Sequence, residues 1–180
     1  MNRREFGEAH ATALGHFAGQ FAVAETVIHD FLVWKSGIDP KLAPAIFSGT
    51  RLSAGIMTIR RIYQAQGRPI EPDVASAFER LQMINGIRNQ VMHYGVTYAW
   101  DEEDVGPFVS NARLAPAPEK VQETNVTVDD LERMTTDLTV CAFILELRLL
   151  EAQDPLATPG APAQLDDAWS YRRRLRVRTR

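Results

Sequence analysis

Apolar residues that recur every three or four positions are the feature that most constrains the fold of this chain. Four segments show this spacing, at residues 4–35, 40–66, 72–93 and 127–153. Because such spacing places apolar side chains on one face of a helix, each segment predicts an amphipathic α-helix. With 180 residues and 45% hydrophobic content, one ordinary domain can bury a real core. We therefore expect an all-α protein, an antiparallel bundle of four main helices.

Residues that favour helix starts and stops lie near the ends of these segments. Asp39 can cap the second helix, and Gly67 suits the left-handed residue that follows it. Thr127 and Asp130 have the spacing of a capping box at the start of the last helix. Gly86, in the middle of the third helix, would allow a neighbouring helix or a ligand to approach closely.

Between the third and fourth predicted helices, the spacing of apolar residues changes from three or four positions to about two. Val96, Tyr98 and Trp100 alternate with smaller or polar residues, and an acidic turn follows at residues 101–107. Alternation of this kind is typical of strands. The sequence thus predicts a short hairpin or ordered loop, inserted before the last helix.

Residues 154–180 differ in composition from the rest of the chain. A linker rich in Pro and Ala is followed by a basic tail, whose last nine residues carry six arginines. Without those nine residues the chain has 14 basic and 23 acidic residues, a net charge of −9. We expect residues 1–153 to form the helical domain and residues 154–180 to be flexible, with room for a short helix around 165–176. The tail is either a solvated end or an arm that binds RNA or an acidic partner through arginines such as Arg172, Arg173 and Arg174.

The single cysteine and the lengths of the apolar stretches indicate the cellular compartment in which the protein works. Cys141 cannot form a disulfide within the chain, which fits a reducing environment, and its apolar neighbours predict a buried side chain. No signal peptide begins the chain, and no stretch reaches the roughly 18 apolar residues that a membrane span needs. We expect a cytoplasmic protein without a membrane partner.

One motif carries chemistry: Arg88-Asn89-x-x-x-His93, at the end of the third helix, followed by Tyr94 and Gly95. Arginine stays charged and can bind two phosphate oxygens at once, and histidine transfers protons near neutral pH. Asparagine could orient the histidine or bind a phosphate oxygen. Since RNA supplies its own nucleophile, the 2′-hydroxyl, these groups suffice for cleavage without a metal. Two facing histidines, one base and one acid, would leave a 2′,3′-cyclic phosphate and a 5′-hydroxyl.

This motif, on the third helix of a small all-α bundle, resembles the HEPN superfamily over about residues 4–153. The resemblance implies a metal-independent endoribonuclease that works as a homodimer, with two motifs facing each other across one cleft. It also implies a toxin or defence effector, with RNA as substrate and an antitoxin or other protein as a possible partner. In one toxin subgroup a tyrosine two residues after the histidine is modified by the antitoxin. Here Tyr94 directly follows His93, so that regulation is not carried over and Tyr94 is taken as an RNA-binding candidate.

Two weaker patterns could suggest other chemistry. Glu25 and His29 are an isolated pair four positions apart on a helix, more often a hydrogen-bonded pair than a metal site. Residues 49–55 are flanked by glycines, yet they lack the lysine and the preceding strand of a phosphate-binding loop. We expect no metal and no cofactor.

Two non-catalytic functions also remain open. One is a HEPN-like domain that binds RNA or a protein without cutting, in which Arg88 would pair with a carboxylate such as Glu25 or Asp30. The other is a small helical interaction protein whose basic tail docks on a larger complex. His10, on the apolar face of the first helix, is expected to be a hydrogen-bonded core residue.

Overall fold

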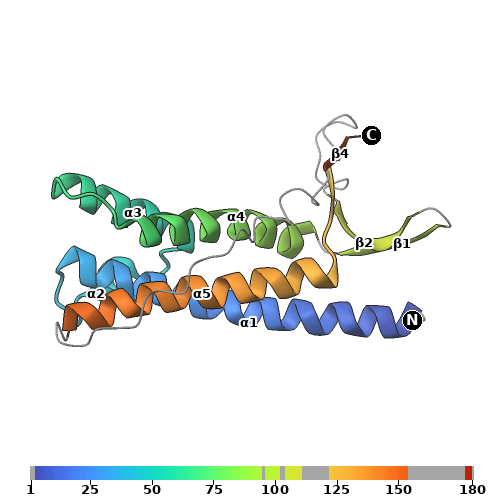
Figure 1. The fold of residues 1–180 in the computed structure, drawn as a ribbon, viewed down its shortest axis with the longest axis horizontal. Coiled ribbons are helices and arrows are strands. Elements are labelled where there is room, and N and C mark those ends of the chain that lie inside the picture. Colours follow the sequence, from blue (N-terminus) through green and yellow to red (C-terminus); the bar gives the residue numbers. More distant parts are fainter. Residues whose placement is uncertain (1–2, 95, 102–103, 111–121, 154–176, 180) are drawn as a thin grey trace. The chain divides into compact units, whose positions relative to one another are not determined.

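The computed structural model describes residues 3–94, 96–101, 104–110, 122–153 and 177–179. Four main helices dominate this part of the chain, and short strands precede the last of them (Figure 1). The expected all-α bundle with an insertion before the last helix is therefore confirmed. In chain order the elements are α1 (Arg3–Ser36), α2 (Ala43–Phe47), α3 (Leu52–Ala65), α4 (Pro72–Tyr94), β1 (Thr97–Asp101), β2 (Asp104–Ser110), β3 (Gln122–Asn125), α5 (Val128–Gln153) and β4 (Val177–Thr179).

Contacts along the chain define two compact units. The first, which we call the strand unit, comprises Met1–Ala18, Gly86–Thr135 and Asp166–Arg180. The second, the helical unit, comprises Gly19–Asn85 and Thr136–Leu165. The three long helices α1, α4 and α5 each contribute residues to both units.

The strand unit contains a four-stranded antiparallel sheet in the order β1-β2-β3-β4. The predicted hairpin is present as β1 and β2, but the turn predicted over residues 101–107 was too long: Asp101 pairs with Asp104, and residues 104–107 belong to β2. Strands β3 and β4 were not predicted, and β4 lies within the basic tail, with Arg178 opposite Glu123 of β3. Residues 154–176 lie outside the described residues, so the flexible linker and the short helix stay predictions.

The core of the strand unit includes a histidine, as expected. The side chain of His10 is only 1% exposed, and its Nε2 lies 3.0 Å from the backbone carbonyl oxygen of Val126. The next residues begin α5 with the predicted capping box: Thr127 Oγ1 accepts from the Asp130 N–H at 3.1 Å, and Asp130 Oδ2 accepts from the Thr127 N–H at 3.1 Å. Buried apolar residues of this unit are Ala13, Phe17, Ile87, Val91, Val109, Val126, Leu131 and Met134.

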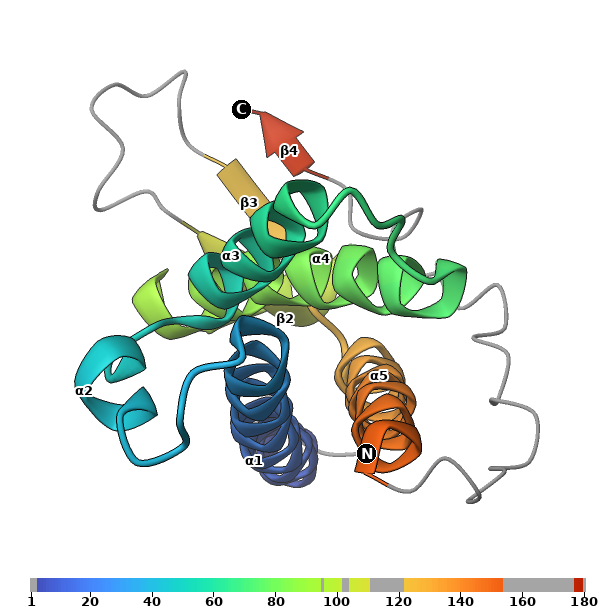
Figure 2. The ribbon, with the colours of Figure 1, turned by 90° about the vertical axis from the view of Figure 1, so that its left-hand side faces the viewer.

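In the helical unit, α4 runs antiparallel to both α3 and α5 (Figure 2). On the α3 side, Asn85 Nδ2 donates to Ser53 Oγ at 2.8 Å, and Tyr63 Oη donates to Glu71 Oε2, which precedes α4, at 2.5 Å. α1 and α3 run parallel, because α2 and its flanking turns carry the chain back before α3 begins. Figure 2 shows α1 and α5 side by side on one side of α4.

The prediction of one helix over residues 40–66 was wrong. Asp39 caps a turn, where its Oδ1 accepts from the Lys41 N–H at 2.9 Å, and the helix begins only at Ala43. Helix α2 then ends after five residues at Phe47. Gly49 adopts a left-handed conformation with φ of 76°, which interrupts the helical path before α3 starts at Leu52.

The glycine predictions had mixed outcomes. Gly67 is left-handed with φ of 64° after α3, as predicted, and the Arg68 N–H closes the helix by donating to the Tyr63 carbonyl at 3.1 Å. No neighbouring helix approaches Gly86 closely, because apart from its own helix no described atom lies within 4 Å of the place of a Cβ, and the approach of a ligand there stays a prediction. Close approach occurs at Gly55 instead, where a Cβ would lie 2.9 Å from Cγ2 of Ile28.

A buried ion pair joins α4 to α5 within the helical unit. Arg80 donates from Nη1 to Oδ2 of Asp137, and the side chains of the two residues are 1% and 6% exposed. A second, more exposed pair joins the same helices, where Arg148 Nη2 lies 2.7 Å from Oδ2 of Asp73. These charged contacts fix the pairing of α4 with α5 amid otherwise apolar packing.

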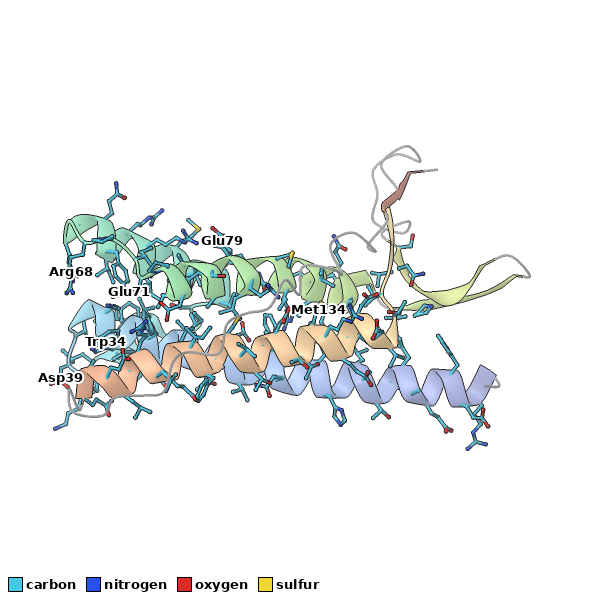
Figure 3. The ribbon with its side chains drawn as sticks, viewed as in Figure 1. Trp34, Asp39, Arg68, Glu71, Glu79 and Met134 are labelled. Carbon is cyan, nitrogen blue, oxygen red and sulfur yellow. The ribbon has the colours of Figure 1, made fainter. Side chains whose placement is uncertain are left out.

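An aromatic and charged cluster closes one end of the helical unit, where Trp34 and Glu71 lie (Figure 3). Lys35 Nζ lies 4.0 Å from the ring centre of Trp34 and 4.3 Å from that of Tyr63. Burial raises the pKa of Glu71, but the hydrogen bond from Tyr63 and the charge of Lys35 outweigh it and the pKa falls below its ordinary value. The ionised form of Glu71 therefore stabilises the folded unit.

Replacing Asp137 should destabilise the protein strongly. Asp137→Ala leaves the Arg80 charge buried without its carboxylate, for which we expect a loss of about 3–5 kcal/mol. The free energy of unfolding from urea titration would measure it. The control is Asp129→Ala, which breaks the exposed Arg133–Asp129 contact of 3.2 Å and should cost no more than about 1 kcal/mol. Equal losses in both variants would contradict the role given to the buried pair.

Glu71 should make stability depend on pH. Since its pKa is lower in the folded than in the unfolded chain, its contribution is present above the ordinary carboxyl pKa and is lost as pH falls. Glu71→Gln should therefore unfold at a lower temperature than the wild type at about pH 7, and the difference should shrink as pH falls below the ordinary carboxyl pKa of about 4.3. Glu79→Gln, an exposed change on α4, should show no such pH-dependent gap.

Candidate functional site

The motif lies in the last two turns of α4, inside the strand unit. The helix ends at Tyr94, as the sequence predicted, and β1 begins at Thr97. Arg88 and Asn89 are half-buried, whereas His93 is exposed. The three polar side chains thus follow one another along a rigid helix and reach the surface at its end.

Arg88 and Asn89 contact each other directly. Arg88 donates from Nη1 to Asn89 Oδ1 at 3.2 Å. The carbonyl oxygen of Asn89 is thus committed to the guanidinium, which indicates a role besides the two named from the sequence, that of orienting the arginine. The Asn89 amide nitrogen keeps two donors, which suit a phosphate oxygen.

His93 is separated from Arg88 around the helix. Five residues at 100° each place their side chains about 140° apart, whereas Asn89 and His93 share one face. A phosphate could touch both Arg88 and His93 only if it approached the helix end from outside. One copy of the chain therefore presents an arginine, an amide and an exposed histidine on one helix.

The other predicted RNA-binding residues are only partly placed. The backbone of Tyr94 closes α4, but its side chain lies outside the described part of the molecule. Arg172, Arg173 and Arg174 also lie outside it. Their binding of RNA stays a prediction.

A cavity that is widely open to solvent, and that the sequence did not reveal, lies at the surface of the helical unit. It measures about 450 Å³ and combines polar residues of α1 with the turn that precedes α3. The pair Glu25 and His29 and the glycine-flanked segment at residue 49 had seemed unrelated in the sequence. The break in the helix at Gly49 brings them to one place. The lining residues are Glu25, Thr26, His29, Gly49, Thr50 and Arg51.

The cysteine has no part in either site. Cys141 is fully buried, as predicted, in the core of the helical unit. Burial, together with the charge of Asp137, raises the pKa of its thiol to about 12. The thiolate, the form that reacts, is therefore scarce at neutral pH.

Neither a candidate metal site nor a helix that could span a membrane is found among the described residues. Within them, no three or more His, Cys, Asp or Glu side chains are grouped so that they could hold a metal ion. None of the described helices is long and apolar enough to cross a membrane.

No protein family model, no curated protein and no solved structure matches this chain. Any assignment of function consequently depends on the residues themselves and on their arrangement.

Cys141 should be unreactive in the folded protein. A thiol reagent at about pH 8 should label it only after urea is added, because its pKa is raised to about 12 and its side chain is buried. The rate of labelling with and without urea, followed by mass spectrometry, checks this. Rapid labelling of the folded chain would contradict both the burial and the structural role.

Proposed function

We propose that this chain is a metal-independent endoribonuclease that acts as a homodimer, as the resemblance of its motif to the HEPN superfamily implies. The observation that carries the proposal is the Arg88–Asn89 hydrogen bond of 3.2 Å, next to an exposed His93 on the last turn of the same helix. The all-helical bundle supports it, since that superfamily has this architecture. A phosphate-binding arginine held in place beside a proton-transferring histidine is what RNA cleavage requires.

The proposed reaction uses the substrate's own hydroxyl. The 2′-oxygen attacks phosphorus while one His93 removes its proton, and the bond from phosphorus to the 5′-oxygen breaks. The leaving 5′-oxygen takes a proton from the His93 of a second copy of the chain. Arg88 binds the non-bridging oxygens and stabilises the negative charge that builds up on them. The products are a 2′,3′-cyclic phosphate and a 5′-hydroxyl.

A second copy is part of this proposal because one motif is incomplete. Each copy supplies one histidine, while the reaction needs a base and an acid at the same phosphate. The wide angle between Arg88 and His93 on α4 also fits a phosphate held between two helix ends better than one held by a single helix.

The biological setting follows from the same resemblance. We propose that the protein acts on RNA in the cytoplasm as a toxin or defence effector, and that an antitoxin or another protein controls it. Tyr94 and the tail arginines Arg172, Arg173 and Arg174 would add contacts to the RNA. Arginines neutralise phosphates without regard to sequence, so this binding should weaken as salt rises.

Cleavage of RNA in the presence of a metal chelator tests the proposal. Wild-type protein should cut, and His93→Ala should be slower by about 10²–10⁴-fold, because it loses proton transfer. Arg88→Ala should be impaired to a similar degree, and Asn89→Ala less so, since the arginine remains but is no longer oriented. Exposed residues on other helices provide matched controls, and His16→Ala and Arg61→Ala should cut at the wild-type rate.

The ends of the RNA fragments test the mechanism, and RNA binding without cleavage distinguishes a binding module from an enzyme. Fragments with a 3′-hydroxyl and a 5′-phosphate, or activity that survives both His93→Ala and Arg88→Ala, would overturn the mechanism. RNA binding that depends on Arg88, without any cleavage, would favour the non-catalytic HEPN-like module instead.

A further inference from the structure

The cavity of about 450 Å³ in the helical unit is separate in sequence from the motif on α4, and it has chemistry of its own. One wall comes from α1, with Glu25, Thr26 and His29. The other wall comes from the turn before α3, with Gly49, Thr50 and Arg51. A carboxylate, an imidazole and a guanidinium thus line one space within a single compact unit.

Local backbone geometry explains why these residues meet. Glu25 and His29 are one helical turn apart and share a face of α1. The left-handed Gly49, with φ of 76°, turns the chain after α2, and the Thr50 N–H donates to the Phe47 carbonyl at 3.0 Å. Arg51 is extended, with φ of −78° and ψ of 158°, and its side chain makes no capping bond to α3.

His29 is held by its neighbours. Its ring packs edge-on against Phe47, with ring centres 6.5 Å apart, and its Nδ1 lies 3.8 Å from Oδ1 of Asp30. The contact with Phe47 positions the imidazole, which is therefore a placed hydrogen-bonding group in the cavity wall.

The two walls have opposite electrostatic character. Arg51 brings a positive charge that matches phosphate oxygens in a two-pronged geometry, with the Thr50 hydroxyl beside it. The first turn of α3 contains no acidic residue, so nothing there opposes an anion. On the α1 side Glu25 accepts hydrogen bonds, and Thr26 already donates its hydroxyl to the Ala22 carbonyl at 3.1 Å, which leaves it an acceptor as well. A fitting ligand has an anion at one end and hydroxyl donors at the other.

We propose that this cavity binds a nucleoside 5′-monophosphate. The phosphate lies against Arg51 and Thr50, and the ribose hydroxyls donate to Glu25, as they do to acidic residues in other nucleotide sites. The volume of about 450 Å³ falls in the range of small-molecule sites, roughly 300–1,000 Å³. This site does not depend on RNA cleavage by the motif on α4, and either one could exist without the other.

Titration of the full-length chain with each of the four ribonucleoside 5′-monophosphates, followed by NMR or calorimetry, tests the proposal. At least one should bind, and Arg51→Ala should weaken it by about tenfold or more, as expected when a charged hydrogen bond is lost. Glu25→Gln should weaken the ribonucleotide but not its 2′,3′-dideoxy analogue. Arg61→Ala, which removes an exposed arginine of α3 outside the cavity, should leave the affinity unchanged.

Several results would overturn this inference. They are the absence of binding by all four nucleotides, equal weakening by Arg51→Ala and Arg61→Ala, and an affinity for inorganic phosphate that matches the nucleotides. Arg51→Lys guards against a folding artefact, because it keeps the charge and should bind with intermediate strength. The 5′-phosphate could come from a free nucleotide or from the end of an RNA, and a parallel titration with a short RNA that bears a 5′-phosphate distinguishes the two. Tighter binding of the RNA would assign the site to RNA ends and would contradict the proposed free nucleotide.

Discussion

The buried pair of Arg80 and Asp137 is the interaction on which the helical unit most depends. Two charges removed from water are costly, and only their direct contact makes that burial tolerable. Apolar side chains could pack in several registers along two helices, whereas a buried guanidinium and carboxylate must meet. The pair therefore specifies how α4 lies against α5 more than it adds stability. The same helix carries Arg88 about two turns further along the chain.

Much of the helical fold could be predicted because helices are local. The apolar spacing, the Thr127–Asp130 capping box and the left-handed Gly67 each depend only on residues a few positions apart. The break after α2 was missed because the apolar period continued through it: Leu42 and Ile46 belonged to the predicted stripe, yet they are 57% and 54% exposed. Strands β3 and β4 were missed since their pairing joins segments far apart in sequence, and such pairing leaves no local periodicity in strands this short.

The two candidate sites also differ in how far apart in sequence their residues lie. The motif could be predicted because Arg88, Asn89 and His93 lie on one helix, so their mutual geometry follows from its period. The cavity could not, because Glu25 and Arg51 come from segments that meet only when the chain turns at Gly49. The α1 side of the cavity gave only a carboxylate–histidine pair, and the turn before α3 gave only a glycine-flanked segment. Neither pattern indicates a site without the other. Sequence reasoning therefore gives the relative placement of residues within one helix, but it misses residues that meet from different elements.

The exposure of His93 to solvent is the reason why the proposed cleavage would need a covering surface in addition to the motif. Positioned donors and acceptors act strongly on a phosphate when water is kept away, because screening weakens them in bulk solvent. His93 stands exposed at the end of α4, next to an arginine already oriented by Asn89. If the proposed cleavage takes place, one copy would lack the low-dielectric surroundings that make such groups effective. A surface that covers the helix end would supply those surroundings, and a second helix end with the same motif would also supply the second proton-transferring group that the proposal needs.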